Sequence, residues 1–396
     1  MSLCYKCRGR LWCKKPKCPL LLKKYEIQKI SLKKEFSSIT PPNVFIGSYN
    51  YPKINAGSLC IPSIQNAESY DNVKSWMDEK LKIDEIVRRR SIVFNTKKDI
   101  DIKDSSSKFI LDFIQPIALS SKQLELEIKL KNIPKISVSF DSENKPMGPS
   151  IELESAKITE NVKINTAVEK VYYQTDLPAV EAINFLDKNN LDVYHLSRLM
   201  SAGTLGIKRK LIPTKWAITA VDDSLGIQKI EDVKNFPLID KFQLFYGGHY
   251  GNRFAVILLP KNWCFELFEF NLKGSLWAKE ETGYTHDFEF YNGRKEYSFE
   301  CSGGYYASRL PVLEYLEKIK KQAGVLIIRQ ISSEYWLPLG VWVVREAVKK
   351  ALNSKFKIFE SKEQVFSYLK QLLDIDFRII QKESRVLNQT IIQDFM

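Results

Sequence analysis

Four of the seven cysteines lie close together at the beginning of the chain, at Cys4, Cys7, Cys13 and Cys18. The residues around them are basic and mostly polar, so a hydrophobic core does not explain these thiols. Two closely spaced thiolate pairs can supply the tetrahedral sulfur ligands that zinc prefers. We therefore predict a small head over residues 1–19 that binds one structural zinc ion. An iron–sulfur cluster or unliganded thiols are the alternatives.

The other end of the chain carries a glutamine followed by spaced apolar residues, namely Gln389, Ile392, Phe395 and Met396. This spacing resembles the peptide that docks on the DNA sliding clamp PCNA, in which a glutamine and an aliphatic residue precede two aromatic ones. One turn of 3₁₀ helix would place Ile392, Phe395 and Met396 on one side as a hydrophobic plug. Polar residues before the peptide predict a flexible tail over residues 381–396. Packing of this tail on its own domain is the alternative.

Basic residues gather at two places in the chain, Arg88-Arg89-Arg90 and the segment around Lys208. In the second segment Gly203 and Gly206 would let the backbone approach a phosphate, while Trp216 could stack on a base. A solvated charged surface with Trp216 in the core is the alternative. The candidate residues for binding nucleic acid or phosphate are Arg88, Arg89, Arg90, Lys208, Arg209, Lys210, Lys215 and Arg253.

Two adjacent carboxylates and one histidine are the candidates for catalysis. Asp222 and Asp223 can hold a divalent cation, or they can cap a helix that begins at Ser224. His249 lies in a glycine-rich, turn-forming segment, and a histidine side chain suits acid–base chemistry near neutral pH. No phosphate-binding glycine motif and no nucleophile motif accompanies these residues in the sequence.

The composition is that of a globular protein with a basic surface. The chain has 396 residues, of which 60 are Lys or Arg and 47 are Asp or Glu, so the formal net charge is +13. Such an excess favours polyanionic partners, which means nucleic acid or an anionic membrane. No apolar run approaches the roughly 20 residues that span a bilayer. We therefore expect a cytoplasmic protein, associated with the nucleoid, whose cysteines form no disulfides.

The hydrophobic pattern predicts a mixed α+β fold. Apolar residues at helical spacing predict helices over residues 71–90, 178–190, 303–322, 341–352 and 363–373. Alternating or continuous apolar runs predict strands over residues 124–130, 136–140, 254–259, 264–270, 325–328 and 356–359. Residues 279–297 are charged, aromatic and irregular, and we place a domain boundary within them.

Several longer segments, taken in order, point to one known family: the cysteine-rich head, Asn43–Gly47 with Tyr51–Lys53, Arg89–Ser91, Gly206–Trp216 with Ala220–Asp223, Gly303–Leu310, Pro338–Glu346 and the terminal peptide. Together they resemble the archaeal NreA-type (Nre) family of DNA repair proteins over nearly the whole chain. The resemblance implies a repair factor that PCNA recruits to DNA. It also implies an N-terminal family region over residues 20–290 and a C-terminal one over residues 291–380. It implies no particular reaction.

Three functions are compatible with these patterns. The first is a DNA repair protein that PCNA recruits and that binds DNA, with or without acting on it chemically. The second is an enzyme that handles nucleotides, in which the terminal peptide provides only localisation. The third is a non-enzymatic adaptor between PCNA and another repair factor. The many glycines and polar residues around Asn43, Lys208 and His249 favour a phosphate-binding cleft, and hence one of the first two functions.

Overall fold

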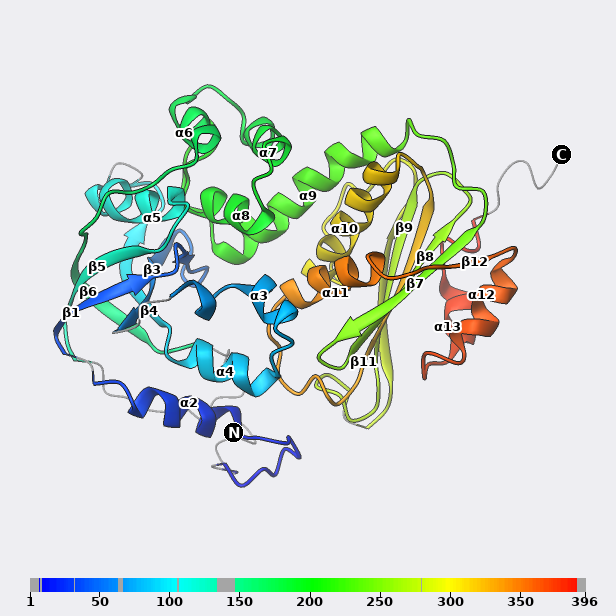
Figure 1. Cartoon of the computed structure of the whole chain (residues 1–396), viewed down its shortest axis with the longest axis horizontal. Coiled ribbons are helices and arrows are strands. Elements are labelled where there is room, and N and C mark those ends of the chain that lie inside the picture. Colours follow the sequence, from blue (N-terminus) through cyan, green and yellow to red (C-terminus); the bar gives the residue numbers. More distant parts are fainter. Residues whose placement is uncertain are drawn as a thin grey trace. The chain divides into compact units, whose positions relative to one another are not determined.

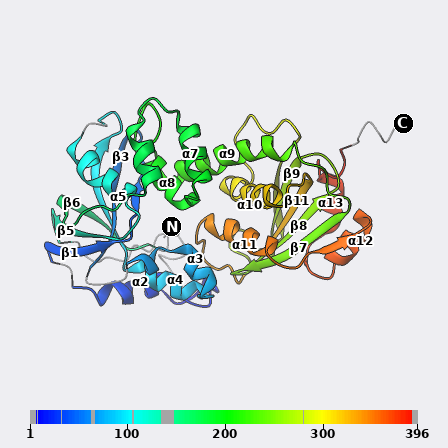
Figure 2. The same cartoon turned by 45° about the horizontal axis from the view of Figure 1, so that its top comes forward.

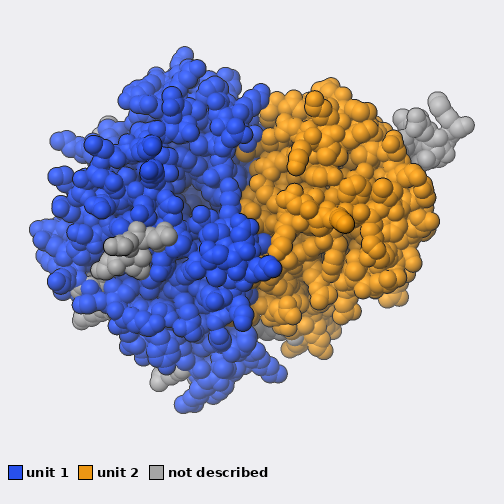
Figure 3. All heavy atoms as spheres, in the orientation of Figure 1, with its two compact units in different colours: residues 1–224 blue, residues 225–396 orange. Residues whose placement is uncertain are grey.

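The computed structural model describes residues 7, 9–31, 33–62, 67–104, 107–133, 147–278 and 280–389. The chain folds as two compact units, residues 1–224 and residues 225–396, which are coloured separately in Figure 3. Both units combine helices with a sheet, so the prediction of an α+β fold is confirmed. None of the helices in the described part of the chain has the length and apolar character needed to span a bilayer.

Unit 1 is built around a six-stranded sheet in the order β1-β5-β6-β4-β3-β2. The end of β3 also pairs with β1, at Ile61 opposite Ile39, so five of the strands form a closed ring. The strands are β1 (Glu35–Thr40), β2 (Val44–Ile46), β3 (Lys53–Pro62), β4 (Phe94–Asp101), β5 (Leu124–Leu130) and β6 (Ser150–Ile158). Along β5 every second residue is buried, as its alternating sequence predicts. The buried side chains of the sheet form one core with the helical segment over residues 110–119.

Short helices surround this sheet, as Figures 1 and 2 show. They are α2 (Pro19–Gln28), α3 (Val73–Asp78), α4 (Ile83–Ser91), α5 (Gln115–Leu119), α6 (Thr166–Tyr173), α7 (Ala179–Lys188) and α8 (Val193–Ser201). The prediction of a single helix over residues 71–90 is wrong, because a short non-helical connection separates α3 from α4. Lys80 has a φ of 54° there, which a continuing α-helix does not permit. The helix predicted over residues 178–190 is confirmed as α7.

Unit 2 contains a six-stranded mixed sheet in the order β10-β9-β11-β8-β7-β12. Its strands are β7 (Phe242–His249), β8 (Asn252–Leu259), β9 (Cys264–Asn271), β10 (Gly283–Glu289), β11 (Gly324–Ile331) and β12 (Lys357–Phe359). The helices α10 (Gly303–Ile319) and α11 (Trp342–Leu352) cover one face. The helices α12 (Lys362–Leu369) and α13 (Phe377–Glu383) cover the other (Figure 1). Each face has its own apolar core, because side chains alternate between the two faces along every strand.

The unit boundary falls inside α9 (Thr214–Val233), a 20-residue helix that the hydrophobic pattern does not predict. This division into compact units differs from the domain boundary that the sequence predicts within residues 279–297. The irregular segment 279–297 includes β10, which pairs with β9 over its whole length and therefore belongs inside unit 2. The strand predicted over residues 136–140 lies outside the described residues.

Candidate functional site

The loop after β2 and the beginning of α9 lie side by side in unit 1, although they are 168 residues apart in the sequence. The backbone N–H of Ile46 donates to Thr214 Oγ1 at 2.9 Å, and Thr214 Oγ1 lies 3.2 Å from Ser201 Oγ. The backbone N–H of Ile212 donates to the carbonyl of Ser201 at 3.0 Å, which holds the segment before α9 in place. These bonds bring together two segments that the sequence analysis considers separately as parts of a phosphate-binding cleft.

Two aromatic side chains meet on the surface at this junction. The ring centroids of Tyr51 and Trp216 are 5.2 Å apart, and their planes are inclined by 57°. Tyr51 is 49% exposed and Trp216 is 44% exposed. The alternative that places Trp216 in the core is therefore wrong. Tyr49, in the same loop, is 80% exposed. These exposed aromatic rings make the junction a candidate for contact with a partner.

The same two segments carry cations and no carboxylates. Residues 41–67 contain neither Asp nor Glu, and the same holds for residues 193–221. The side chains of Lys208, Lys210 and Lys215 are exposed. We call the loop 47–53 together with residues 203–216 the aromatic–basic surface. Because these segments contain no acidic residues, their cations attract polyanions without local neutralisation by the same segments.

Arg209 differs from the lysines on either side of it. Its Nε donates to the carbonyl of Gly206 at 3.2 Å, and its Nη2 donates to the carbonyls of Tyr172 at 2.5 Å and Gln174 at 3.4 Å. The guanidinium also lies over the Tyr172 ring, 5.2 Å from its centroid. Arg209 therefore fastens this loop to the end of α6, which is a structural role that the sequence did not reveal.

Gly203 and Gly206 are required by the backbone conformation of the loop itself. Gly203 and Gly206 have φ angles of 67° and 82°, in the left-handed region that favours glycine. A Cβ atom on Gly203 would lie 2.8 Å from the Lys210 carbonyl carbon, and one on Gly206 would lie 2.9 Å from Ala179 Cβ. The two glycines thus permit tight turns, whether or not a phosphate approaches them.

The three consecutive arginines of α4 each pair with a carboxylate from a different part of unit 1. These ion pairs are Arg88–Glu26 at 2.9 Å, Arg89–Glu79 at 3.0 Å and Arg90–Asp71 at 3.1 Å. Arg90 also lies over the ring of Trp76, 5.0 Å from its centroid. In this structure the cluster connects α4 to its neighbours. The aromatic–basic surface is therefore the stronger candidate for binding phosphate.

The candidate catalytic residues are divided between the two units. Asp222 and Asp223 lie in the interior of α9, nine and ten residues into the helix, so the prediction that they cap a helix starting at Ser224 is wrong. Asp222 is buried, whereas Asp223 is half-buried. His249 ends β7 in unit 2, where its ring packs edge-on against Tyr250 at 4.0 Å. Arg253 follows in β8 and is exposed.

The cysteine-rich head is described only in part, because Cys4 lies outside the described residues. The backbone N–H of Trp12 lies 3.2 Å from Cys7 Sγ. Burial raises the pKa of the Cys7 thiol, but backbone N–H groups of residues 9–12 outweigh it, so the pKa is below the ordinary value. Among the described residues, no three His, Cys, Asp or Glu side chains form a group that could hold a metal. The zinc site stays a prediction.

The three remaining cysteines are core residues, as their isolation in the sequence predicts. Cys60, Cys264 and Cys301 are all buried. Burial raises the pKa of Cys60 to about 12 and that of Cys264 to about 11. These thiols are therefore protonated at neutral pH, which fits a packing role. Cys7, Cys13 and Cys18 are likewise free of disulfides.

The flexible tail predicted from residue 381 is folded as far as the structure describes it. Glu266, a buried carboxylate on β9, accepts hydrogen bonds from Ser384 Oγ, from the Arg385 N–H at 3.0 Å and from the Val386 N–H at 3.2 Å. We call this arrangement the Glu266 clasp. Val386 is fully buried. Ser384 and two backbone N–H groups of residues 381–388 bind to Glu266, so the prediction of a mobile tether there is wrong.

Three further contacts surround the clasp. Lys261 Nζ donates to the carbonyl of Val386 at 2.6 Å, and Asn388 Nδ2 donates to the carbonyl of Gln381 at 3.0 Å. His286 Nδ1 lies 3.3 Å from Glu266 Oε1, the oxygen that also accepts from the Arg385 N–H. Of the predicted clamp-binding residues, Gln389 is exposed. Ile392, Phe395 and Met396 lie outside the described residues.

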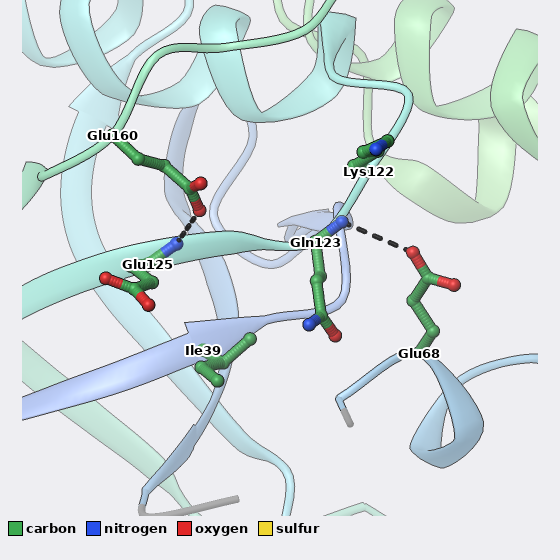
Figure 4. A pocket seen from close by; sticks show the side chains of 6 residues that line it. All are labelled: Ile39, Glu68, Lys122, Gln123, Glu125 and Glu160. Carbon is green, nitrogen blue, oxygen red and sulfur yellow. Dashed lines mark hydrogen bonds between the residues drawn. The ribbon is translucent and has the colours of Figure 1, made fainter. Parts of the chain in front are cut away.

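An open pocket on unit 1 has a lining that does not suit an anion. It has a volume of about 470 Å³, and Figure 4 shows its lining residues, Ile39, Glu68, Lys122, Gln123, Glu125 and Glu160. The Gln123 N–H donates to Glu68 at 3.3 Å, and the Glu125 N–H donates to Glu160 at 2.6 Å. Three carboxylates against one ammonium group would repel a phosphate. Two of those carboxylates already accept backbone hydrogen bonds.

Sequence reasoning missed two residues of these sites, Tyr51 and Glu266. The signal for Tyr51 was available, because it lies in a long segment without acidic residues and follows Tyr49 at a spacing of two. No sequence signal marks Glu266, because its partners lie about 118 residues further along the chain.

The chain matches two family models in succession. Residues 12–278 match the model described as "Archaeal Nre, N-terminal", and residues 289–395 match the model described as "Archaeal Nre, C-terminal". Together the two regions span both compact units, although the break between them does not coincide with the unit boundary in α9.

Three curated proteins are similar over most of their length. A protein of Archaeoglobus fulgidus named "DNA repair protein NreA" is 38% identical, over 99% of this chain and 98% of the relative. "DNA repair protein NreB" of the same organism is 33% identical, over 97% of this chain and 96% of the relative. "DNA repair protein NreA" of Haloferax volcanii is 34% identical, over 89% and 87% respectively. No solved structure matches the chain significantly.

Proposed function

Because the chain belongs to the archaeal Nre family, we propose that it is a DNA repair protein that binds DNA through unit 1. Relatives similar along nearly the full length carry the name DNA repair protein, which supports the repair role. The observation that carries DNA binding is the aromatic–basic surface, where exposed lysines and aromatic rings occur on segments without acidic residues. Lysines neutralise phosphates, and aromatic rings contact bases.

The test of DNA binding separates the lysines from the structural arginine. Replacing Lys208 and Lys210 by Gln should weaken DNA binding and make its salt dependence shallower, by about 0.7–0.9 in log–log slope for each phosphate that is no longer neutralised. Arg209 is left unchanged, because it holds the loop through backbone carbonyls. The measurement is fluorescence anisotropy with a labelled oligonucleotide at several salt concentrations.

The matched control replaces two exposed lysines on either side of Glu160, Lys157 and Lys163, by Gln. This control removes the same net charge and should change the affinity much less. Equal losses in both double variants would contradict a localised DNA-binding surface. A variant that keeps DNA affinity but loses affinity for mononucleotides would favour the nucleotide-handling alternative. Absence of DNA affinity in the unaltered protein would favour the adaptor.

We further propose that residues 389–396 recruit the protein to PCNA. The terminal sequence supports this, because Gln389, Ile392, Phe395 and Met396 have the spacing of a clamp-binding peptide. The Glu266 clasp holds the residues up to Asn388 on unit 2, so the peptide begins where the clasp ends. Recruitment would then place the aromatic–basic surface of the same chain near the DNA that the clamp encircles.

A structural zinc ion in the head is the proposed cofactor. The N–H groups that face Cys7 Sγ favour a thiolate, the form in which cysteine binds zinc. We expect about one zinc per chain by elemental analysis of protein made in zinc-replete medium. Cys13→Ser should lose this zinc, since three ligands bind more weakly than four. Cys264→Ala removes a buried core thiol and should retain the zinc. A metal-free wild-type protein would eliminate the site.

A further inference from the structure

We propose that Tyr51 and Trp216 form a stacking site for an unpaired base, so that unit 1 prefers single-stranded DNA to intact duplex. The inference rests on the proposed DNA binding and names the form of DNA that is bound. It starts from the juxtaposition of two aromatic rings, 5.2 Å apart, in residues that are each roughly half exposed; the segment that leads to Trp216 also carries exposed lysines.

The fold holds the backbone around both aromatic residues in place. Trp216 is the third residue of α9, and its helix begins at Thr214, which is bonded to Ile46 and Ser201. Tyr51 lies between bonds at both ends of its loop. The Gly47 N–H donates to the Asn55 carbonyl at 2.8 Å, and the Ile102 N–H donates to the Pro52 carbonyl at 3.2 Å. Such preorganisation lowers the entropic cost of binding.

The two rings leave room for a third. Their planes are inclined by 57°, so they are not stacked face to face, and the two residues are 49% and 44% exposed. A planar base can therefore lie against an exposed ring face, as bases do on aromatic side chains in proteins that bind single strands. Tyr49, the most exposed aromatic of the loop, provides a further ring for a neighbouring base.

The positive charges favour nucleic acid, rather than an apolar protein surface, as the ligand of this site. Lys208, Lys210 and Lys215 are exposed and lie in a segment without acidic residues, which matches a phosphate backbone. Lys53 is left out of this set, because Asp101 lies opposite it in the pairing of β3 with β4. Aromatic rings between cations are the pattern by which single strands are bound without sequence preference.

Base pairing decides which form of DNA can use the rings. In a duplex the bases are stacked on each other and their faces are covered, so a surface aromatic ring reaches only the backbone. An unpaired base exposes its face and can stack. Removing one of the two rings should therefore weaken binding of a single strand by about 5- to 150-fold. Binding of a duplex should hardly change.

The experiment compares Trp216→Ala, Tyr51→Ala and Trp216→Phe in the full chain, with far-UV circular dichroism as the check on folding. Anisotropy is measured on a labelled single strand, on its duplex and on an RNA of the same sequence. Trp277→Ala is the matched control, because Trp277 is an exposed tryptophan of unit 2. The expected result is a loss of at least about 5-fold on single-stranded DNA for Trp216→Ala and Tyr51→Ala. Trp216→Phe should retain most of the affinity.

Two further readouts identify stacking itself. The salt slope of Trp216→Ala should equal that of the wild type, because the variant neutralises the same number of phosphates. Fluorescence quenching by the single strand should be smaller in Trp216→Phe than in the wild type. Equal losses on single strand and duplex, or no loss on either, would overturn the stacking site. An RNA that binds tighter than the DNA would overturn the assignment to DNA.

The outcome is distinguishable from failure of the proposed function. If the wild-type protein binds neither form of DNA, DNA binding by unit 1 is wrong, and the stacking site falls with it. If Lys208→Gln/Lys210→Gln weakens binding but the aromatic variants do not, DNA binding stands and only the stacking site is wrong.

Discussion

Truncation after Asn388 is expected to abolish binding to PCNA while leaving zinc content and thermal stability nearly unchanged. The truncation removes residues 389–396, which carry the four predicted contact residues. It keeps Ser384, Val386 and Asn388, whose bonds form the clasp on unit 2. Phe395→Ala should cost at least about 2 kcal/mol of binding free energy, as expected for an aromatic anchor in a desolvated pocket. Titration calorimetry with the cognate clamp measures both effects.

Two variants separate a specific clamp contact from general hydrophobic adhesion. Met396→Phe restores the second aromatic residue of the pattern and should tighten binding. Asn388→Ala changes the residue just before the peptide and should leave the clamp affinity within a few-fold of wild type. If the truncated protein still bound the clamp with wild-type affinity, recruitment through this peptide would be wrong.

Arg309→Met is expected to destabilise unit 2 by about 3–5 kcal/mol, because it leaves a buried carboxylate without its cation. Arg309 and Glu289 form an ion pair at 2.7 Å, and their side chains are only 2% and 0% exposed. Glu289 also accepts a hydrogen bond from Trp263 Nε1, at 3.3 Å, but that donor carries no charge. Methionine has a similar length and keeps the apolar contacts, so the loss of stability reports mainly on charge.

Hydrogen exchange of the α10 and β9 amides is the appropriate measurement, because a chain of two units has no single free energy of unfolding. Exchange through opening of unit 2 should become at least about 100-fold faster in Arg309→Met. Replacing both partners, as Arg309→Met/Glu289→Leu, should restore most of the protection. The exposed pair Lys241–Glu360, at 2.6 Å, is the control, and Glu360→Gln should cost less than about 1 kcal/mol. Equal effects at both pairs would contradict this account.

The elements that the sequence predicts well are those whose pattern reflects the burial of apolar side chains. The apolar runs 254–259 and 264–270 become β8 and β9, which are buried on both faces of the unit 2 sheet. The helices α10 and α11 were also predicted. In each of these elements the local secondary-structure preference agrees with the tertiary environment. A single sequence is then enough to predict the element.

The strand β10 was missed because its buried residues are its polar ones. Asp287 and Glu289 face the core, while Tyr284 is exposed. Asp287 accepts from Arg294 at 3.1 Å, and Glu289 accepts from Arg309. The hydrophobic alternation of a half-buried strand is thus inverted by partners that only the folded chain brings close. A different cause hid α9, inside which Asp222-Asp223-Ser224 imitates a helix start.

The candidate site was predictable in its residue types and not in its assembly. Lys208, Lys210 and Trp216 were proposed from the sequence, and each of them is exposed on unit 1. Their aromatic partner Tyr51 was not, since a contact between distant segments leaves no periodic signal. Conversely, Arg209 looked like one more phosphate ligand, and its bonds to backbone carbonyls became visible only in the folded loop.

The Glu266 clasp would also limit how far unit 2 can move relative to a clamp bound to the proposed terminal peptide. A flexible linker of n residues lets its ends separate by roughly 5–6 Å × √n, so a long one would let unit 2 wander far from a clamp that holds the peptide. Here Asn388 is bonded to the backbone of α13, and the peptide starts at the next residue. If PCNA binds residues 389–396, almost no linker would therefore separate unit 2 from the clamp. Recruitment would then restrict the orientation of unit 2 relative to the clamp as well as its distance from the clamp. Moving unit 2 away to make room for another clamp partner would require the clasp to open.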